Sequence, residues 1–333
     1  MNLLELRGVT VKFRQSGTPA RVVSAVEGVD ITIGEHEMLG LVGESGCGKT
    51  TLGRAILRLV PLAAGEVHWR GQRIDHLGSR AFRPLRRELQ CVFQDPNASL
   101  DPRMTLIESV AEPLRALDPG TGPEERARRS QAQLDEVGIG TDLAERYPHQ
   151  LSGGQLQRAV IARALILNPR FVVCDEPVSA LDVSVQGQII GLLEQIRDDR
   201  GLSSLFISHN LAVVARLCER VMVMFHGRVV EVAGRRALIE SPLHPYTREL
   251  LDAVPATDAG ARTRILKRAA RAIPSSDDVG KTSGCPFAAR CPKVLPRCRI
   301  ERPPLQAVAG DARLVACHRA GEWPRGLPPL APV

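Results

Sequence analysis

The sequence of 333 residues contains no long uninterrupted hydrophobic run. Charged residues or glycine interrupt every apolar stretch before it reaches the roughly 18 residues that a membrane-spanning helix needs. The opening stretch MNLLELRGVTVKF places Glu5, Arg7 and Lys12 among alternating apolar residues, unlike the apolar core of a secretory signal. We therefore expect a chain that does not itself cross a membrane and that lies in the cytoplasm.

Most of the chain also lacks an excess of charge of either sign. The formal net charge is +7, but the part from Val254 onward holds 14 basic and 6 acidic residues, so the basic excess belongs to this part. Arginines scattered through a proline-rich stretch are typical of a solvated surface rather than of a nucleic-acid interface. We therefore expect no nucleic-acid partner. The hydrophobic fraction of 44% is typical of a globular protein.

The cysteines lack the CxxC spacing of a zinc knuckle. Four of the eight are dispersed, whereas the other four crowd together with the spacing Cx5Cx6Cx18C, namely Cys285, Cys291, Cys298 and Cys317. In a reducing cytoplasm such a group favours metal binding over disulfides. Four thiolates could enclose Zn²⁺ or a [4Fe-4S] cluster, and the spacing does not decide between them. Reduced cysteines without a metal are the remaining alternative.

Hydrophobic patterns of strand and helix alternate along the chain. The segments LELRGVTVKF and VDITI alternate like strands and predict an antiparallel β subdomain. Further strands are predicted in MLGLVG, FVVCDEP and LSSLFISH, helices in TTLGRAILRLV, AVIARALI and VQGQIIGLLEQIRDD, and a hairpin in VMVMFHGRVVEVAG. Residues 97–150, rich in Arg, Glu and Ala, predict an inserted helical subdomain. Together these elements predict an α/β fold with a largely parallel sheet and helices on its faces.

The motif GESGCGKT lies between a predicted strand and a predicted helix. It fits the phosphate-loop pattern GxxxxGK[ST] in the context that this pattern requires. In such a loop backbone amides surround phosphate oxygens, the lysine neutralises the β- and γ-phosphates, and the threonine hydroxyl is offered to Mg²⁺. The alternative is a glycine-rich turn with an incidental lysine. The residues expected to contact ATP here are Gly43, Ser45, Gly46, Cys47, Gly48, Lys49, Thr50 and Thr51, with Thr50 also a Mg²⁺ ligand.

Two further motifs suit a nucleotide site. Asp175 and Glu176 follow the apolar run FVVC, at the carboxyl end of a predicted strand, where ligands collect in parallel sheets. We hypothesise that Asp175 positions Mg²⁺ and that Glu176 polarises the attacking water. A solvated strand end is the alternative. The motif LSGGQ begins a predicted helix and exposes amide groups that suit a phosphate, unless it is only a helix cap with flexible glycines.

GESGCGKT, LSGGQ, VVCDEP, SALD and the histidine of FISHN occur together and in order, so residues 1–250 resemble the ATP-binding cassette of ABC transporters. The resemblance implies ATP hydrolysis with ATP and Mg²⁺ as cofactors. In that family two cassettes face each other head to tail, which implies that LSGGQ completes the site of a partner subunit. The residues concerned are Ser152, Gly153, Gly154 and Gln155.

The resemblance also assigns roles to single residues. It implies that Gln94 in VFQDP contacts Mg²⁺ and the attacking water, that Asp182 in SALD links the two sites, and that His209 contacts the γ-phosphate. Phe13 is the aromatic nearest the position that the family uses to stack adenine. The residues alone leave alternatives open. Gln94 could lie in a polar loop and Asp182 could cap a helix. His209 could be a structural histidine and Phe13 a buried β residue.

VFQDPNASLDPRMT, SPLHPYTRELLDAVP and the cysteine-bearing part resemble the oligopeptide, dipeptide and nickel importer branch, and GESGCGKTTLGRAILRL resembles the second of its two unlike cassettes. This implies a second, homologous ATPase cassette, two permease subunits and, indirectly, a solute-binding protein. It also implies a peripheral position on the cytoplasmic face of the membrane and a C-terminal extension over residues 251–333. Some members of the branch carry an iron–sulfur cluster on this cysteine pattern, which favours [4Fe-4S] over Zn²⁺, although IPSSDDVGKTSGC lacks the proline-rich approach expected there.

Two other functions could use the same motifs. One is a cassette ATPase that acts on DNA or ribosomes, but only about 100 residues separate the phosphate loop from LSGGQ, too few for a long coiled-coil arm. The other is a nucleotide-binding regulator that senses metal through the cysteines. The resemblance to importer cassettes implies that selectivity for the transported solute resides in the partner subunits.

Overall fold

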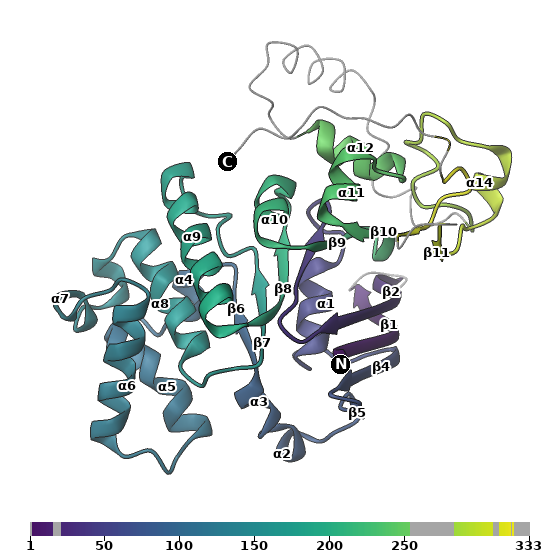
Figure 1. Cartoon of the computed structure of the whole chain (residues 1–333). Helices are drawn as coiled ribbons and strands as arrows, with labels where there is room; N and C mark the ends of the chain where they lie inside the picture. The colour runs from purple at the N-terminus through teal and green to yellow at the C-terminus, as the bar shows by residue number, and fades with distance from the viewer. Residues whose placement is uncertain (1, 16–20, 254–282, 309–312, 321, 323–333) are drawn as a thin grey trace.

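The computed structural model describes residues 2–15, 21–253, 283–308, 313–320 and 322, arranged around two β-sheets (Figure 1). The smaller sheet has the strand order β2–β1–β4–β5 and is antiparallel. Its strands are β1 (Asn2–Gln15), β2 (Arg21–Gly34), β4 (Ala64–Trp69) and β5 (Gln72–Arg73). The antiparallel pairing predicted at the start of the chain is confirmed.

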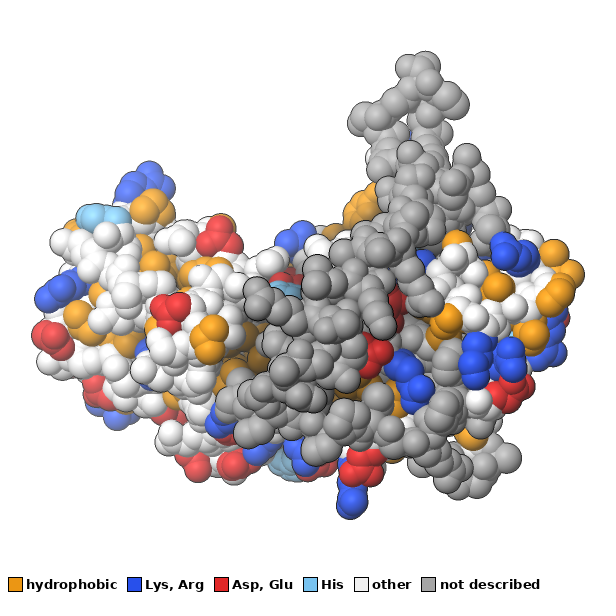
Figure 2. Space-filling view, turned by 90° about the horizontal axis from the view of Figure 1, so that it is seen from above, with side chains coloured by type: hydrophobic (Ala, Val, Ile, Leu, Met, Phe, Trp, Pro, Cys, Tyr) orange, Lys and Arg blue, Asp and Glu red, His pale blue; other side chains and the backbone are white. Residues whose placement is uncertain are grey.

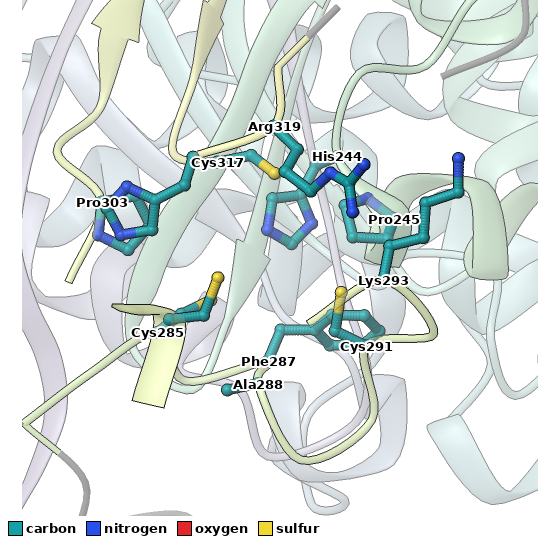
Figure 3. A pocket seen from close by; sticks show the side chains of 12 residues that line it. His244, Pro245, Cys285, Phe287, Ala288, Cys291, Lys293, Pro303, Cys317 and Arg319 are labelled. Atoms are coloured by element: carbon teal, nitrogen blue, oxygen red, sulfur yellow. The ribbon is translucent and has the colours of Figure 1, made fainter. Parts of the chain in front are cut away.

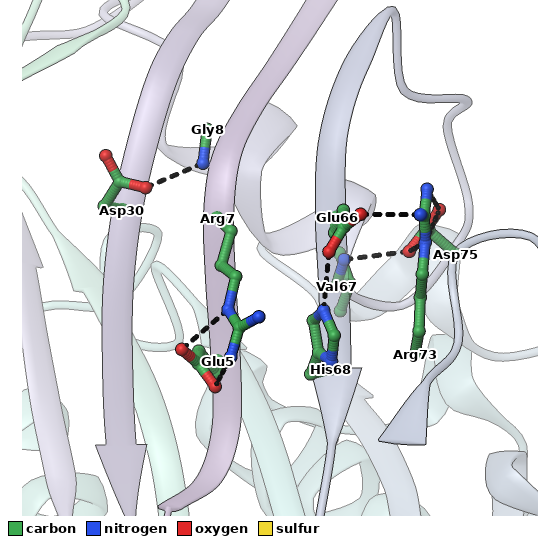
Figure 4. A network of polar contacts seen from close by, with 9 residues as sticks. All are labelled: Glu5, Arg7, Gly8, Asp30, Glu66, Val67, His68, Arg73 and Asp75. Atoms are coloured by element: carbon green, nitrogen blue, oxygen red, sulfur yellow. Dashed lines mark hydrogen bonds and ion pairs between the residues drawn. The ribbon is translucent and has the colours of Figure 1, made fainter. Parts of the chain in front are cut away.

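Polar side chains form networks along this antiparallel sheet (Figure 4). Gly8, which has φ of 58°, donates its backbone N–H to Asp30 at 2.7 Å, where the register of β1 shifts. On β4, Glu66 accepts hydrogen bonds from Arg73 at 2.6 Å and pairs with His68 at 2.8 Å. Such exposed pairs add little stability each. Burial of the apolar residues of these strands in one hydrophobic cluster contributes more to holding the sheet in place.

The larger sheet has the strand order β11–β12–β10–β9–β3–β8–β7–β6. From β9 to β6 neighbouring strands run parallel, and from β9 to β11 they run antiparallel. The strands are β3 (Met38–Val42), β6 (Leu89–Val92), β7 (Phe171–Asp175), β8 (Ser203–Ser208), β9 (Arg220–Phe225), β10 (Arg228–Gly234), β11 (Gln306–Ala307) and β12 (Leu314–Val315). The predicted parallel sheet and the predicted hairpin, β9–β10, are confirmed.

The parallel strands are buried on both faces. In β7, Phe171 and Val173 pack into one hydrophobic cluster, whereas the alternating residues Val172 and Cys174 pack into another. A strand covered on both faces reads as a continuous apolar run rather than an alternating one. This explains the apolar stretches that precede the phosphate-loop motif, Glu176 and His209.

Four helices cover the two faces of the parallel strands. They are α1 (Lys49–Ile56), α8 (Gly153–Leu165), α9 (Val183–Arg200) and α10 (Leu211–Leu217). The helix predicted over TTLGRAILRLV is shorter than expected, because α1 ends at Ile56 and Arg58 then takes a positive φ of 53°. Apolar residues at helical spacing continue past Ile56, but the backbone there is no longer helical.

The predicted helical segment between the two β-bearing parts is helical. Its elements are α4 (Pro96–Ser99), α5 (Leu106–Leu117), α6 (Pro123–Glu136), α7 (Thr141–Ala144) and η1 (Pro148–Gln150). Helix α5 begins with a capping box, in which Thr105 accepts from the Glu108 backbone and Glu108 accepts from the Thr105 backbone. Helices α5, α6 and α7 lie at the opposite end of the molecule from the antiparallel sheet (Figure 1). The limits 97–150 for a separate subdomain stay a prediction.

The part after the hairpin is more regular than its composition indicated. Its helices, not predicted individually, are α11 (Arg235–Glu240), α12 (Pro245–Asp252) and α14 (Pro296–Ile300). Two short helices much earlier in the chain, between β5 and β6, were not predicted individually either, namely α2 (Ser79–Phe82) and α3 (Leu85–Glu88). The cysteine-bearing part consists, among the described residues, of 283–308 and 313–320. Its strand β12 pairs with β10 and so joins this part to the main sheet. Residues 254–282 lie outside the described part of the chain. The boundary at residue 250 stays a prediction.

No helix within the described ranges is both long enough and apolar enough to span a bilayer. Seen from above, the described surface carries acidic and basic side chains scattered among hydrophobic and uncharged ones (Figure 2).

Gly40 on β3 tests the packing of the main sheet against α10. A Cβ atom on Gly40 would lie 2.2 Å from Val214 Cγ1 and 3.3 Å from Cys218 Sγ. We expect Gly40→Ala to lower the free energy of unfolding by about 1–3 kcal/mol, because overpacking forces the neighbours to move. Urea-induced unfolding measures this change.

The matched control is Gly191→Ala on α9. A Cβ atom there would meet nothing within 4 Å, so alanine should raise stability by roughly 0.5–1 kcal/mol through its higher helix propensity. Equal unfolding free energies for the two variants would contradict the packing argument.

Candidate nucleotide site

The motif GESGCGKT forms the loop between β3 and α1. Gly46 and Gly48 have positive φ angles of 78° and 105°. A Cβ atom on Gly48 would lie 2.1 Å from the Ala25 carbonyl oxygen, so glycine alone permits this close approach to β2. The loop leads directly into α1, whose first backbone N–H groups are available to an anion.

Lys49 is the first residue of α1 and is buried, with 4% of its surface exposed. Its ammonium group donates to the carbonyl oxygen of Gly43 at 2.8 Å and to that of Glu44 at 3.0 Å. It also lies 3.8 Å from Glu176 Oε1. A buried cation needs such partners, because desolvation costs several kcal/mol. Phosphate oxygens are acceptors of the same kind for the Lys49 ammonium group.

Asp175 ends β7, and its Oδ1 accepts a hydrogen bond from Thr50 Oγ1 at 2.9 Å. Burial raises the pKa of the Asp175 carboxyl, while the hydrogen bond from Thr50 and the charges of Arg54 and Lys49 act in the opposite direction. Hydroxyl and carboxylate oxygens are the ligands that Mg²⁺ prefers. The Thr50–Asp175 pair therefore fits a magnesium ion in its chemistry.

Glu176 has a positive φ of 47°, which is strained for a residue with a side chain. Its backbone N–H donates to the Ile207 carbonyl oxygen at 3.0 Å. Gln94 Nε2 donates to Glu176 Oε2 at 3.3 Å, and His209 Nδ1 lies 3.1 Å from the same oxygen. The strained backbone thus aims one carboxylate at two polar side chains from separate loops.

These residues surround an open cavity of about 700 Å³. Predicted site residues that line it are Ser45, Gly46, Gly48, Lys49, Thr50, Thr51, Gln94, Glu176 and His209. Four lining residues were not predicted, namely Ala25, Asp95, Ser179 and Ala180. Gly43 and Cys47 belong to the loop but do not line the cavity. Asp175 does not line it either, but it accepts a hydrogen bond from Thr50, which does. The volume is within the range of small-molecule sites.

The LSGGQ motif does not line this cavity. Ser152 is the N-cap of α8, and it forms a capping box with Gln155 through bonds of 2.9 and 3.3 Å. Ser152 and Gly153 are exposed, and a Cβ atom on Gly154 would lie 2.6 Å from Val185 Cγ1. Within one chain, therefore, the motif caps a helix and packs against α9, apart from the phosphate loop.

Asp182 and Phe13 also lie outside the cavity lining. Asp182 is the N-cap of α9, where it accepts from the Val185 backbone at 3.0 Å and from Ser184 Oγ at 2.7 Å. These hydrogen bonds lower the pKa of its carboxyl, with Ser184 the larger cause. Phe13 pairs with Val23 across the antiparallel sheet and is 42% exposed, so it is not the buried β residue considered above.

The four clustered cysteines line one small cavity, together with His244 and Phe287 (Figure 3). Burial raises the pKa of Cys285 and Cys291, and it raises that of Cys317 to about 11. Yet no three Cys, His, Asp or Glu side chains in the described segments are placed to hold a metal ion. The cysteines thus converge, but without the geometry of a metal centre.

Three contacts at the rear of the phosphate loop were not predicted. Arg290 forms two hydrogen bonds with Glu44, and the Glu44 backbone N–H donates to Tyr246 Oη at 2.8 Å. Because Arg290 and Glu44 are 246 positions apart, no local spacing could have indicated their contact.

Comparisons with known proteins identify the class of this chain. The ABC transporter family matches residues 26–179, and the family described as oligopeptide/dipeptide transporter, C-terminal region, matches residues 230–298. A solved dimer of the ATP-binding cassette MJ0796 with ADP and Pi has a TM-score of 0.64 at 31% identity, covering 70% of this chain and 99% of that chain. The chain thus has the ABC ATPase fold.

Two similar relatives narrow the group of ABC proteins to which the chain belongs. The oligopeptide transport ATP-binding protein OppF of Escherichia coli (strain K12) is 45% identical over 289 residues, or 86% of each chain. The glutathione import ATP-binding protein GsiA of Salmonella paratyphi A is 52% identical over 260 residues, which are 77% of this chain and 42% of GsiA. The chain therefore belongs to the ABC transporter ATPases that carry the oligopeptide/dipeptide transporter C-terminal region.

Thr50 offers a test of the magnesium ligands. We expect Thr50→Ala to weaken binding of ATP in the presence of Mg²⁺ by about tenfold, because the predicted hydroxyl ligand and the hydrogen bond to Asp175 are lost. Binding of ATP without Mg²⁺ should change far less. Equilibrium titration with a fluorescent ATP analogue, with and without Mg²⁺, measures both.

Thr50→Ser is the matched control, since it keeps the hydroxyl and removes only a methyl group. It should bind ATP and Mg²⁺ like the unaltered chain. Equal weakening in both variants would show that the methyl group, not the hydroxyl, matters.

Proposed function

We propose that this chain is the ATP-hydrolysing subunit of an ABC importer that takes up peptides or a related solute through separate permease subunits. The observation that carries the proposal is the Glu176 carboxylate, which faces the phosphate-loop cavity between Gln94 and His209. The relatives OppF and GsiA, named for oligopeptide transport and glutathione import, support the class of cargo. They also make an ATPase acting on DNA or ribosomes the less favoured reading.

We propose that Glu176 accepts the proton of the attacking water. Gln94 and His209 meet its carboxylate and are placed to orient the water and the γ-phosphate. Lys49 carries the charge that offsets the β- and γ-phosphates. Thr50, Gln94 and Asp175 would hold Mg²⁺, which supplies further neutralisation of phosphate charge when bound.

A second, homologous cassette completes the proposed site. Ser152, Gly153, Gly154 and Gln155 start α8 away from the cavity of their own chain. A helix start with exposed amides suits a γ-phosphate held by the other subunit. In this arrangement Asp182 links the two sites. ATP favours the closed pair of cassettes by contacting both of them, and ATP hydrolysis allows the pair to open. The resemblance to the second of two unlike cassettes favours a heterodimer.

The remaining partners follow from the same proposal. Two permease subunits would contact the helical part at residues 97–150 and the segment after Gln94, with residues 1–250 as the nucleotide-binding domain and 251–333 as the extension. A solute-binding protein would act indirectly, and no nucleic acid takes part. The chain would lie on the cytoplasmic face of the membrane as a peripheral subunit. Phe13, which is exposed, remains the proposed adenine platform.

Glu176→Gln tests the proposed function. We expect ATP binding to be retained and ATP turnover to fall by about 10²–10⁴-fold, because the amide cannot accept the proton of the water. Steady-state phosphate release and equilibrium ATP binding, both on the full-length chain with its partner subunits, separate the two effects.

Glu240→Gln on α11 serves as the control, because Glu240 is exposed and pairs only with the neighbouring Arg236 among the contacts described. It should leave turnover unchanged. Normal hydrolysis by Glu176→Gln would remove the assigned role, and loss of hydrolysis without loss of solute uptake would separate the ATPase from transport.

We propose further that the four clustered cysteines hold a [4Fe-4S] cluster, with Zn²⁺ as the alternative. Their shared cavity and the thiolate preference of both groups support this. The full-length chain purified without oxygen should then contain stoichiometric iron and show a broad brown absorption. Cys291→Ser should abolish both, whereas Cys91→Ser, outside the group, should not. Stoichiometric zinc would favour the alternative. A preparation that contains neither iron nor zinc would overturn the proposal.

A further inference from the structure

Arg290 connects the cysteine-bearing part to the phosphate loop. Its guanidinium donates to Glu44 Oε2 at 2.9 Å and to Glu44 Oε1 at 2.7 Å. It also donates to Glu249 Oε1 on α12 at 2.7 Å. One side chain thus joins three segments that are far apart in the sequence.

Aromatic rings hold the guanidinium in place. Its Cζ lies 5.5 Å from the ring centre of Phe225, 5.8 Å from that of Tyr246 and 5.4 Å from that of Phe287. The three rings also contact one another, with centres 4.5 to 5.7 Å apart. Guanidinium groups bind aromatic faces favourably. The rings therefore restrict the position of Arg290 in addition to the carboxylates.

Glu44 is the second residue of the phosphate loop and does not line the nucleotide cavity, whereas the next two residues, Ser45 and Gly46, do. Its side chain is held by Arg290, its backbone N–H by Tyr246 and its carbonyl oxygen by Lys49. Glu44 is thus the point at which the rear of the loop is attached. Any change in its side-chain partner acts on the loop that surrounds the phosphates.

This contact differs from the other ion pairs at the surface. Exposed pairs of long side chains contribute little, because solvent screens them and ordering them costs entropy. Here the arginine side chain is only 21% exposed, it binds the carboxylate with both nitrogens of its fork, and aromatic rings order it in advance. A lysine would supply the charge without the fork.

Backbone hydrogen bonds in the segment between two of the clustered cysteines set the backbone of Arg290. The backbone N–H groups of Arg290 and Cys291 both donate to the Phe287 carbonyl oxygen, and that of Ala288 donates to Cys285. Residues 285–291 therefore form consecutive turns that begin and end at a cysteine. The arginine projects from these turns toward the loop.

We propose that Arg290 is a positioning residue of the ATP site, which fixes the phosphate loop through Glu44 and so makes ATP affinity depend on the cysteine-bearing part. The proposal rests on the proposed function, because it assumes that this loop binds ATP. Arg290 touches no reacting group. Its effect should appear in ATP affinity and leave the chemical step largely intact, because Glu176, Gln94 and His209 lie on other segments.

Arg290→Met in the full-length chain, assembled with its partner subunits, tests the proposal. We expect the KM for ATP to rise about tenfold with kcat within about threefold, and the Kd of a fluorescent ATP analogue to rise in parallel. Arg290→Lys should recover part of the affinity. The matched control is Arg297→Met, which alters another arginine of the same part, one that donates to the His318 carbonyl oxygen.

A double-mutant cycle with Glu44→Gln distinguishes positioning from a general loss of stability. If Arg290 acts through Glu44, the combined variant should bind ATP no more weakly than Arg290→Met alone. Additive losses, or a Kd within twofold of the unaltered chain in folded Arg290→Met, would overturn the proposal. If Arg290→Met does not fold, Arg290→Lys and Glu44→Gln give the same comparison. An unaltered chain that binds no ATP would instead overturn the proposed function.

Discussion

The parallel pairing of β3, β8 and β7 is the constraint on which the ATP site depends. The register places Val42 opposite Ser208 and Asp175 opposite Ile207. Because the three strands end nearly level, the residues that follow them emerge at one edge of the sheet. The phosphate loop, Glu176 and the histidine after β8 therefore meet around one cavity, although they lie far apart in the sequence. A shift of one residue in this register would separate the lysine from the carboxylates.

Two unfavourable features are maintained at this edge. Lys49 is charged and buried, and Glu176 has a backbone conformation that costs of order 1–3 kcal/mol. Both are surrounded by the hydrogen bonds of the loop and by the packed strands on either side. Strain and desolvation of this kind persist where the surroundings over-determine the geometry. The fold itself thus holds the Glu176 carboxylate in contact with the Gln94 and His209 side chains.

The parts of this structure that could be predicted are those in which sequence neighbours are also spatial neighbours. The strand, loop and helix around Lys49 form one continuous segment, and the apolar run before Asp175 marks a strand buried on both faces. The end of α1 at Ile56 could not be predicted, because apolar spacing continues past it. Nor could the Arg290–Glu44 contact, which exists only once the chain after β10 has folded back. The roles proposed for Ser152 and its neighbours concern a second chain and so cannot be derived from the contacts within one cassette.

The pairing of β12 with β10 has a consequence for the isolated protein. Without β12, strand β10 would end the large sheet, with a row of unpaired backbone groups flanked by valines. Exposed edges of this kind are templates for aggregation with other chains. The short strands β12 and β11, only two residues each, pair with the middle of that edge and leave little backbone for another molecule to extend. The cysteine-bearing part therefore also protects the cassette against self-association through its β-sheet.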